Sequence, residues 1–317
     1  MSDPAAGAST TLCFHEGELA VQRRAGVLDE AARLSGMLAP ARLGDGVSRF
    51  LAERTFAAIT ARDAAGNLWI SPLVGPPGFL RVAAPTVLEV GALPAEGDPL
   101  RRLPAPQAVG LIVIEFALRR RLRVNGTLAH AGRDGLRVDV REAFGNCPQY
   151  IQARILHEAP AAARRAGPVR HGLALTAEDV ALIRRSDTFF IGSTHPGRGS
   201  DASHRGGPPG FVRVENGRLW WPDYRGNNMF NTLGNLDLDP TAALLFPDFA
   251  TGRTLQLSGR AALRWISPGS AGDDGRTGRR VDFTPQRLVA ATLLPLRAGS
   301  VAAPDNPPAD GRPRPFR

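Results

Sequence analysis

The amino-acid sequence predicts a mainly β protein with a few helices, built from two tandem copies of one antiparallel domain. The chain has 317 residues, enough for two domains of about 120 to 150 residues each. One phrase occurs twice, as SPLVGPPGF from Ser71 and as SHRGGPPGF from Ser203. Both halves also contain many short runs of β-branched and aromatic residues bounded by Gly, Pro, Asn and Asp, which is typical of antiparallel barrels and sandwiches.

The duplication extends beyond this phrase, because other matches keep nearly the same spacing. Thr55-Phe56 recurs 133 positions later as Thr188-Phe189. Ordered matches at one spacing indicate an internal repeat. Further matches, also 133 positions apart, pair 110–116 with 243–249 and 123–128 with 256–261. We expect an N-terminal extension, a first domain, a linker, a second domain and a disordered Pro-rich tail over residues 1–44, 45–160, 161–175, 176–297 and 298–317.

The expected strands follow the same duplication, and a hairpin turn is expected at Asn216-Gly217. Helices are few, and the one over 176–186 has a capping pattern in Thr176 and Asp179. The other expected helices cover 26–38, 47–53, 148–156 and about 228–237. The expected strands cover 55–61, 78–84, 109–116 and 121–131 in the first copy, and 188–194, 210–222, 242–249 and 254–263 in the second.

Composition excludes several classes of protein. No apolar run reaches the roughly 18 residues of a membrane helix, and no basic and apolar leader begins the chain, so we expect a soluble cytoplasmic protein without a membrane partner. Cys13 and Cys147 are expected to be free thiols. The net charge of +9 is scattered along the chain, so no nucleic-acid partner is expected.

All 39 basic residues are arginine, because the sequence contains no lysine. A pyridoxal phosphate enzyme needs a lysine amine for its Schiff base, so that class is excluded. Any bound phosphate must be held by arginine, polar side chains or backbone amides. Residues 197–202 match GxGxxA, but the prolines that follow prevent a helix from starting there, which excludes a dinucleotide site. His195 and His204 have no evident third ligand, and no metal is expected.

The polar residues of the second copy form the candidate site. Gly206, Gly207 and Gly210 allow a backbone to approach a ligand, and His204 and Arg205 supply donors for a phosphate. A group of asparagines at 227, 228 and 231 lies where a helix is expected to begin, and its free amides favour an anion. The alternative interpretation is that GPPGF is only a turn, which we favour for the first copy.

These residues resemble the pyridoxamine 5'-phosphate oxidase-like family of FMN-binding split β-barrels. SHRGGPPGFVRV is similar to the SPRGGPPGFV phrase of one bacterial branch, with His204 in place of a proline, and the similarity runs from Phe14 to about Pro295. FHEGELAVQ at 14–22 and FGNCPQYIQAR at 144–154 resemble the first half of double-barrel members. The resemblance implies two tandem Greek-key split barrels that pair within one chain as an internal pseudo-dimer, with FMN between them.

The resemblance also implies the cofactor site and a flavin-dependent oxidoreductase of unknown substrate, although enzymatic activity is left open. His204 is the candidate proton donor, and a small substrate or reductant is the expected partner, with a homodimer left open. The family holds phosphate with arginine and lysine together, so Arg205, Arg225 or the asparagines would have to substitute here. Arg119, Arg120, Arg121 and Arg123 are either a second phosphate grip or solvated. The cofactor-binding candidates are Ser203, Arg205, Gly206, Gly207, Asp223, Tyr224, Arg225, Asn227, Asn228 and Asn231, with Asn146, Gln149 and Tyr150 on the opposing wall.

Two alternatives keep the fold and change the function. Related split barrels bind haem or a deazaflavin, and His195 or His204 would then be an axial ligand. The third hypothesis is a non-catalytic protein that binds or sequesters flavin.

Overall fold

Two antiparallel sheets with the same strand order form the body of the protein, which we describe from a computed structural model. The structure describes residues 14–38, 42–161 and 167–299. The first sheet has the order β2-β1-β5-β6-β7-β4-β3, and the second has the order β11-β10-β14-β15-β16-β13-β12. Each strand of the second sheet therefore takes the place of the strand nine labels earlier. The identical topology confirms the internal duplication predicted from the repeated phrases.

The bounds of the strands follow from the described residues. The first sheet contains β1 (Phe56–Arg62), β2 (Leu68–Val74), β3 (Leu80–Ala84), β4 (Val87–Val90), β5 (Gln107–Glu115), β6 (Arg120–Gly132) and β7 (Gly135–Gly145). The second contains β10 (Thr188–His195), β11 (Gly199–Gly206), β12 (Arg213–Glu215), β13 (Arg218–Pro222), β14 (Thr241–Pro247), β15 (Arg253–Trp265) and β16 (Arg279–Thr292). Short strands β8 (Leu156–Glu158) and β17 (Leu296–Ala298) pair with each other, and β9 (Arg170–Gly172) pairs with β16.

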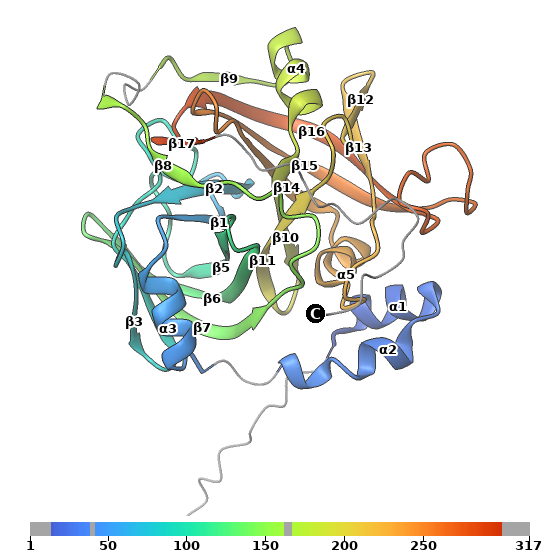
Figure 1. The fold of residues 1–317 in the computed structure, drawn as a ribbon, viewed down its shortest axis with the longest axis horizontal. Helices are drawn as coiled ribbons and strands as arrows, with labels where there is room; N and C mark the ends of the chain where they lie inside the picture. The colour runs from blue at the N-terminus through green and yellow to red at the C-terminus, as the bar shows by residue number, and fades with distance from the viewer. Residues whose placement is uncertain (1–13, 39–41, 162–166, 300–317) are drawn as a thin grey trace, which may run out of the picture.

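The helices lie at the periphery of the two sheets (Figure 1). They are α1 (Glu16–Ala25), α2 (Leu28–Ala32), a 3-10 helix (Ser35–Leu38), α3 (Asp45–Ala52), α4 (Ala177–Arg185) and α5 (Asn231–Leu238). Helix α1 packs on α5 through two glycines: a Cβ on Gly17 would overlap the Gly234 carbonyl oxygen. This contact brings the N-terminal segment onto the second barrel. None of the helices in the described ranges has the length and apolar character needed to cross a bilayer.

Four apolar clusters lie among the described residues, and three of them form the cores of the barrels and of the junction between them. One fills the first barrel and includes Leu111 and Val124, and another fills the second barrel and includes Phe189. The third lies between the barrels, where Phe56 of β1 and Phe190 of β10 pack with ring centroids 5.5 Å apart. The two barrels therefore pair through a core of their own, as the internal pseudo-dimer requires.

Most of the expected elements are present. Every expected strand overlaps a strand of the structure, and helices α3, α4 and α5 match three of the expected helices. Thr176 and Asp179 form the predicted capping box of α4. Asn216 and Gly217 connect β12 and β13 as a two-residue turn with φ of 50° and 75°. The tail predicted to be disordered lies outside the described residues from position 300 onward.

The helix expected over 148–156 is wrong. Residues 149–155 contain no regular element, and Tyr150 has a φ of 64°, which a helix does not allow. Tyr150 stacks on Tyr224 and Ile151 is buried between the barrels, so tertiary contacts override the local helix propensity. The helix expected over 26–38 is divided into α2 and the 3-10 helix, and α1 was not predicted.

Candidate functional site

A polar cleft lies where the first barrel meets the edge strand β11 of the second. The first barrel contributes β6 and the segment that follows β7, and the second contributes β11 and the segment that follows β13. The lining residues are Arg121, Arg123, Asn146, Cys147, Gln149 and Tyr150 on one side, and Ser203, His204, Arg205, Gly206, Phe211, Trp221, Pro222, Asp223, Tyr224, Gly226 and Asn227 on the other.

The volume of this cleft is about 620 Å³, which is within the range of small-molecule sites, about 300 to 1,000 Å³. The predicted residues that line it are Asn146, Gln149, Tyr150, Ser203, His204, Arg205, Gly206, Asp223, Tyr224 and Asn227. The segment proposed as an opposing wall therefore does lie opposite the SHRGG phrase. Four predicted residues do not line the cleft: Gly207, Arg225, Asn228 and Asn231. Of these, Asn231 lines a neighbouring pocket instead.

The glycine-rich phrase is the end of a strand followed by a turn, rather than a ligand loop. Ser203 to Gly206 belong to β11. A Cβ on Gly207 would lie 2.6 Å from the Phe211 ring, and Gly210 has a φ of 86°. Gly75 and Gly78 of the first copy have the same two roles. The expectation that Gly207 and Gly210 admit a ligand is therefore replaced by a turn that both copies share.

Gly206 has a different role, because it lies where the two walls of the cleft contact each other. A Cβ at this position would overlap the carbonyl oxygen of Tyr150. The first copy has Val74 at the corresponding position. Glycine is therefore needed in the second copy because the backbone of the first barrel crosses β11 at this point.

Three arginine side chains converge in the cleft. Arg123 donates to Asp201 Oδ2 at 2.9 Å and to Ser203 Oγ at 2.8 Å. Arg121 lies 3.1 Å from His204 Nδ1, measured from its terminal nitrogen. In the described part of the chain, the Arg205 guanidinium has neither a hydrogen bond nor an ion pair within 4.0 Å. The sequence left open whether the arginines at 119–123 hold a phosphate or are solvated. Arg121 and Arg123 both line the cleft.

The guanidinium groups are desolvated and repel one another. Desolvation by burial, with the charges of Arg123 and Arg205, lowers the pKa of Arg121 to about 9. Burial also lowers the pKa of Arg205, against the attraction of Asp223. Asp223 itself is paired with Arg279 Nε at 2.9 Å. The cleft therefore has an excess of positive charge, which an anionic ligand would neutralise.

Several buried polar atoms at the cleft have no hydrogen-bond partner among the described residues. They are Arg121 Nε, Arg123 Nε, His204 Nε2 and Asn146 Oδ1. Buried polar groups are ordinarily hydrogen-bonded, and an unpaired one costs about 1 to 3 kcal/mol. A ligand with several acceptor oxygens would supply partners to the arginine nitrogens. This group of unpaired atoms distinguishes the cleft from an ordinary packed interface.

His204 is a neutral imidazole enclosed by aromatic rings. Burial lowers its pKa well below the usual value, and the charges of Arg121, Arg154 and Arg205 lower it further. Its ring lies 5.6 Å from that of Phe190 and 6.3 Å from that of Phe116. Because an arginine can only donate, Nδ1 accepts from Arg121 and Nε2 carries the hydrogen. Its role as a proton donor stays a prediction.

Two tyrosines form one wall of the cleft. The rings of Tyr150 and Tyr224 are stacked, with centroids 5.0 Å apart and planes at 16°. The Tyr150 hydroxyl donates to the carbonyl oxygen of Arg225 at 2.9 Å. Burial, with Tyr224 and Asp223 beside it, raises the pKa of Tyr150 to about 12, so the phenol stays protonated. The pair connects the two barrels and offers an aromatic surface to a ligand.

The repeat predicts a second groove at β2, the edge strand of the first barrel that corresponds to β11, and packed side chains fill it. Gln256, which the repeat aligns with Arg123, donates to Ser71 Oγ at 2.8 Å and to Asp98 Oδ2 at 3.0 Å. Leu73, in the place of Arg205, is fully buried. Burial raises the pKa of Asp98 to about 6. Among the described residues of this groove Gln256 Oε1 has no partner, but no arginine lies beside it as in the cleft at β11, so the groove offers no unpaired guanidinium nitrogen.

The second copy also matches a family model. Residues 175–272 match the model described as pyridoxamine 5'-phosphate oxidase. The matched segment covers most of the second barrel and is similar to that family. The predicted resemblance is thereby confirmed for the second copy, and the common strand order extends the same fold to the first copy. No curated protein matches the chain.

Solved structures with a similar fold cover little more than one copy. HupZ of Group A Streptococcus has 11% identity and a TM-score of 0.31, over 36% of this chain and 91% of its own. The FAD binding protein of Mycobacterium smegmatis has 12% identity and a TM-score of 0.27, over 39% and 98%. An FAD-binding protein of Mesorhizobium loti has 10% identity and a TM-score of 0.26, over 39% and 97%.

Proposed function

We propose that the cleft binds FMN and that the protein is an FMN-dependent oxidoreductase. The observation that carries the proposal is the convergence of Arg121, Arg123 and Arg205 on one cleft, with unpaired guanidinium nitrogens. A phosphate monoester has a charge near −2 and several acceptor oxygens, and arginine binds it with charge-assisted hydrogen bonds. Since the sequence contains no lysine, arginine is the one side chain that can supply a permanent positive charge for this contact.

The residues around the arginines suit the rest of the cofactor. Tyr150 and Tyr224 offer an aromatic surface for a flat ring system, and the amides of Asn146, Gln149 and Asn227 can bond its polar edge. Bound FMN would supply the hydride or electron transfer, while the chain supplies binding, orientation and electrostatics. A small-molecule substrate or reductant would complete the reaction.

FMN is preferred to the other cofactors for two reasons. A terminal phosphate monoester concentrates a charge near −2 on one phosphate, whereas the diphosphate of FAD spreads the same charge over two, so the monoester better matches guanidinium groups that converge on one place. Haem is not proposed, because His204 Nε2 is buried beside aromatic rings and His195 lies in a different pocket. His204 also has no proton-transfer role in the proposal, since its imidazole is neutral; it receives a hydrogen bond that orients Arg121.

The visible absorption spectrum of the purified chain, with the mass of the released cofactor, tests the proposal. We expect a flavin spectrum and the mass of FMN, and riboflavin, which lacks the phosphate, should bind about 100-fold more weakly. A Soret band, or equal affinity for riboflavin and FMN, would contradict it.

A pair of variants tests the site itself. Arg205→Ala should reduce the affinity for FMN by about tenfold or more, since it removes a charge-assisted contact. Arg120→Ala is the matched control, because Arg120 is exposed and its guanidinium lies over Phe50 at 5.3 Å, outside the cleft. Equal loss in both variants would show that general surface charge, rather than the cleft, holds the cofactor.

A further inference from the structure

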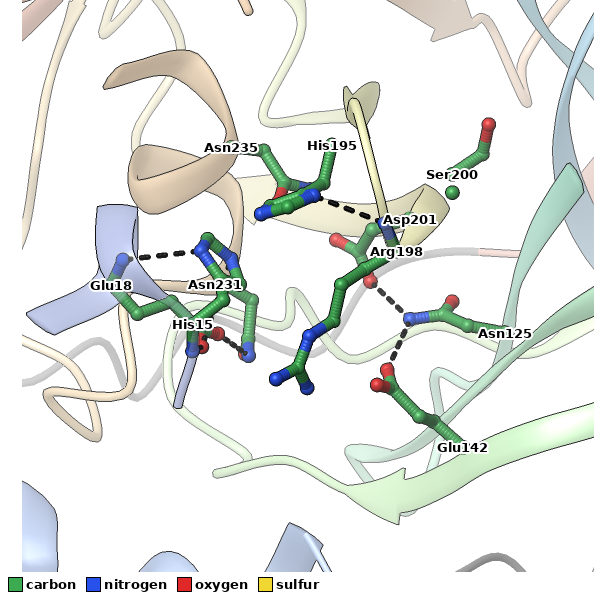
Figure 2. A pocket seen from close by; sticks show the side chains of 11 residues that line it. His15, Glu18, Asn125, Glu142, His195, Arg198, Ser200, Asp201, Asn231 and Asn235 are labelled. Carbon is green, nitrogen blue, oxygen red and sulfur yellow. Dashed lines mark hydrogen bonds and ion pairs between the residues drawn. The ribbon is translucent and has the colours of Figure 1, made fainter. Parts of the chain in front are cut away.

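A second pocket of about 430 Å³ lies between helix α1 and both barrels. It is separate from the arginine cleft and shares no lining residue with it. Apart from one glycine, every residue that lines it has a polar or charged side chain. In Figure 2, His15, His195, Asn231 and Asn235 lie on one side of the pocket, and Asn125 and Glu142 lie on the other. Neither the family resemblance nor the proposed flavin site assigns a role to this pocket.

Hydrogen bonds from the backbone fix the tautomers of the two histidines. Nδ1 of His195 accepts from the backbone N–H of Gly197 at 2.9 Å and of Arg198 at 3.0 Å. Nδ1 of His15 accepts from the backbone N–H of Glu18 at 3.4 Å. A neutral imidazole has one hydrogen, so Nε2 carries it in both rings. Both histidines therefore offer an N–H donor from Nε2.

This arrangement disfavours a metal ion. His15, Glu16 and His195 bring one ligand atom each within 4.8 Å of one another, a separation compatible with coordination. A metal would need a lone pair on Nε2, but in these tautomers Nε2 carries a hydrogen and Nδ1 is occupied by backbone donors. The pair of imidazoles is better suited to a ligand with acceptor oxygens.

A carboxylate, that of Glu16, already lies next to the His195 ring. His195 is only 7% exposed, and its Nε2 has no hydrogen-bond partner in the described part of the chain. The nearest acceptor is the carboxylate of Glu16, 3.5 Å away, on an exposed side chain. A free carboxylate could replace Glu16 there and complete the hydrogen bond. Arg198 also lines the pocket, and in Figure 2 its side chain lies between the two groups of residues, where it adds a positive charge.

The opposite side of the pocket offers acceptors. Asn125 Nδ2 donates to Glu142 Oε2 and to Asp201 Oδ1, each at 3.2 Å. These two bonds fix the orientation of the amide, and they leave its buried Oδ1 without a partner in the described chain. Glu142 adds negative charge beside it, while the charge of Asp201 is paired with Arg123 at 2.9 Å. A group with several N–H donors, such as an ammonium, matches this side.

We propose that this pocket binds a small zwitterion of the α-amino acid class. The carboxylate would accept from His195 Nε2 and its neighbours, and the ammonium would donate to Asn125 Oδ1 and Glu142. A simple anion would face the carboxylate of Glu142, and a simple cation would leave the buried N–H of His195 unpaired. Only a ligand with both groups pairs both sides.

Isothermal titration calorimetry of the full chain tests this inference, with the proteinogenic amino acids as probes, beginning with glycine. We expect at least one of them to bind saturably with one site per chain. Acetate has only the carboxylate and methylammonium has only the ammonium, so each should bind at least about tenfold more weakly than the amino acid. The inference is overturned if no amino acid gives saturable heat, or if acetate binds as tightly as the best amino acid.

Three variants locate the binding. Glu142→Gln should reduce the affinity about tenfold, because it removes the charge that faces the ammonium. Asp139→Asn removes a carboxylate from the exposed face of the same strand and should leave the affinity unchanged. Glu16→Ala should raise the affinity, since it removes the competing carboxylate. Equal affinity in the parent and Glu142→Gln would overturn the inference; thermal unfolding of each variant verifies that it is folded. The measurement needs no flavin, so its result is independent of the proposed cofactor.

Discussion

The Arg123 guanidinium donates to Ser203 Oγ at 2.8 Å, a hydrogen bond that crosses from the first barrel to the second. The repeat places Gln256 and Ser71 at the corresponding positions, and they form the corresponding bond, also at 2.8 Å. The two contacts have the same geometry, but only one includes a charge. The internal duplication therefore produced two similar junctions, and a few substitutions divided them into a charged cleft and a packed interface.

Arg123→Gln converts the charged junction into the form of its counterpart. We expect a loss of about 3 kcal/mol in the free energy of unfolding, because Asp201 is only 3% exposed and would lose its ion pair. Denaturant unfolding measures this change. The double variant Arg123→Gln, Asp201→Asn should recover most of the loss, since the buried charge is then gone. A double variant no more stable than the single one would contradict this account.

Gly206→Ala should force apart the two walls of the cleft. The new methyl group would overlap the Tyr150 carbonyl oxygen, so we expect a destabilisation of about 1 to 3 kcal/mol by thermal or denaturant unfolding. Gly226→Ala is the control within the same cleft, because a Cβ there meets no atom within 4 Å; its effect should stay within about 0.5 kcal/mol. Similar losses in both would mean that Tyr150 is not fixed against β11.

His204 should remain neutral throughout the physiological range. Burial, with three nearby arginines, lowers its pKa well below the usual value, so its NMR signals should not titrate between about pH 6 and pH 8. The chain has six histidines, and comparison with His204→Gln assigns the signal. A titration with a midpoint near pH 7 would restore His204 as a candidate proton donor.

Local patterns in the sequence were sufficient for much of the fold. The repeated phrases predicted the duplication, and the capping residues Thr176 and Asp179 predicted the start of α4. Helix α1 was missed because its N-cap is a histidine, which bonds Glu18 as Ser or Thr would in the usual capping box. The helix predicted over 148–156 is wrong because contacts with distant parts of the chain, which the local sequence does not show, hold Tyr150 and Ile151.

The candidate site was predictable only in part. The polar phrase at Ser203 to Gly206 identified one wall, and the segment at 146–150 was correctly placed opposite to it. Arg121 and Arg123 could not be separated from Arg119 and Arg120, because the sequence does not show which strand lies across from β6. The second pocket was missed since its residues come from α1, α5 and both barrels, which only the packing brings together.

Glu18 should make stability depend on pH. Burial raises its pKa from 4.5 to about 7, and the nearby Glu142 and Asp201 raise it, against hydrogen bonds from the His15 backbone and Asn231. The folded state therefore binds more protons than the unfolded state between about pH 4.5 and pH 7, so the contribution of Glu18 to stability decreases as the pH rises through this window. The total change is about 3 kcal/mol, at about 1.4 kcal/mol for each pKa unit.

Glu18→Gln isolates this effect from the other buried groups. His15 acts in the opposite direction, because burial lowers its pKa to about 4 and its contribution rises with pH from about 4 to 6.5; it is present in both proteins and cancels in their difference. Relative to the parent, the variant should therefore gain about 3 kcal/mol in its free energy of unfolding from pH 4.5 to pH 7. Glu16→Gln, on the exposed side of the same helix turn, should follow the parent from pH 4.5 to pH 7, because the pKa of Glu16 is lowered and it titrates below this window. A constant difference between the parent and Glu18→Gln would mean that the Glu18 carboxyl is ionised in the folded protein throughout, and that solvent reaches it.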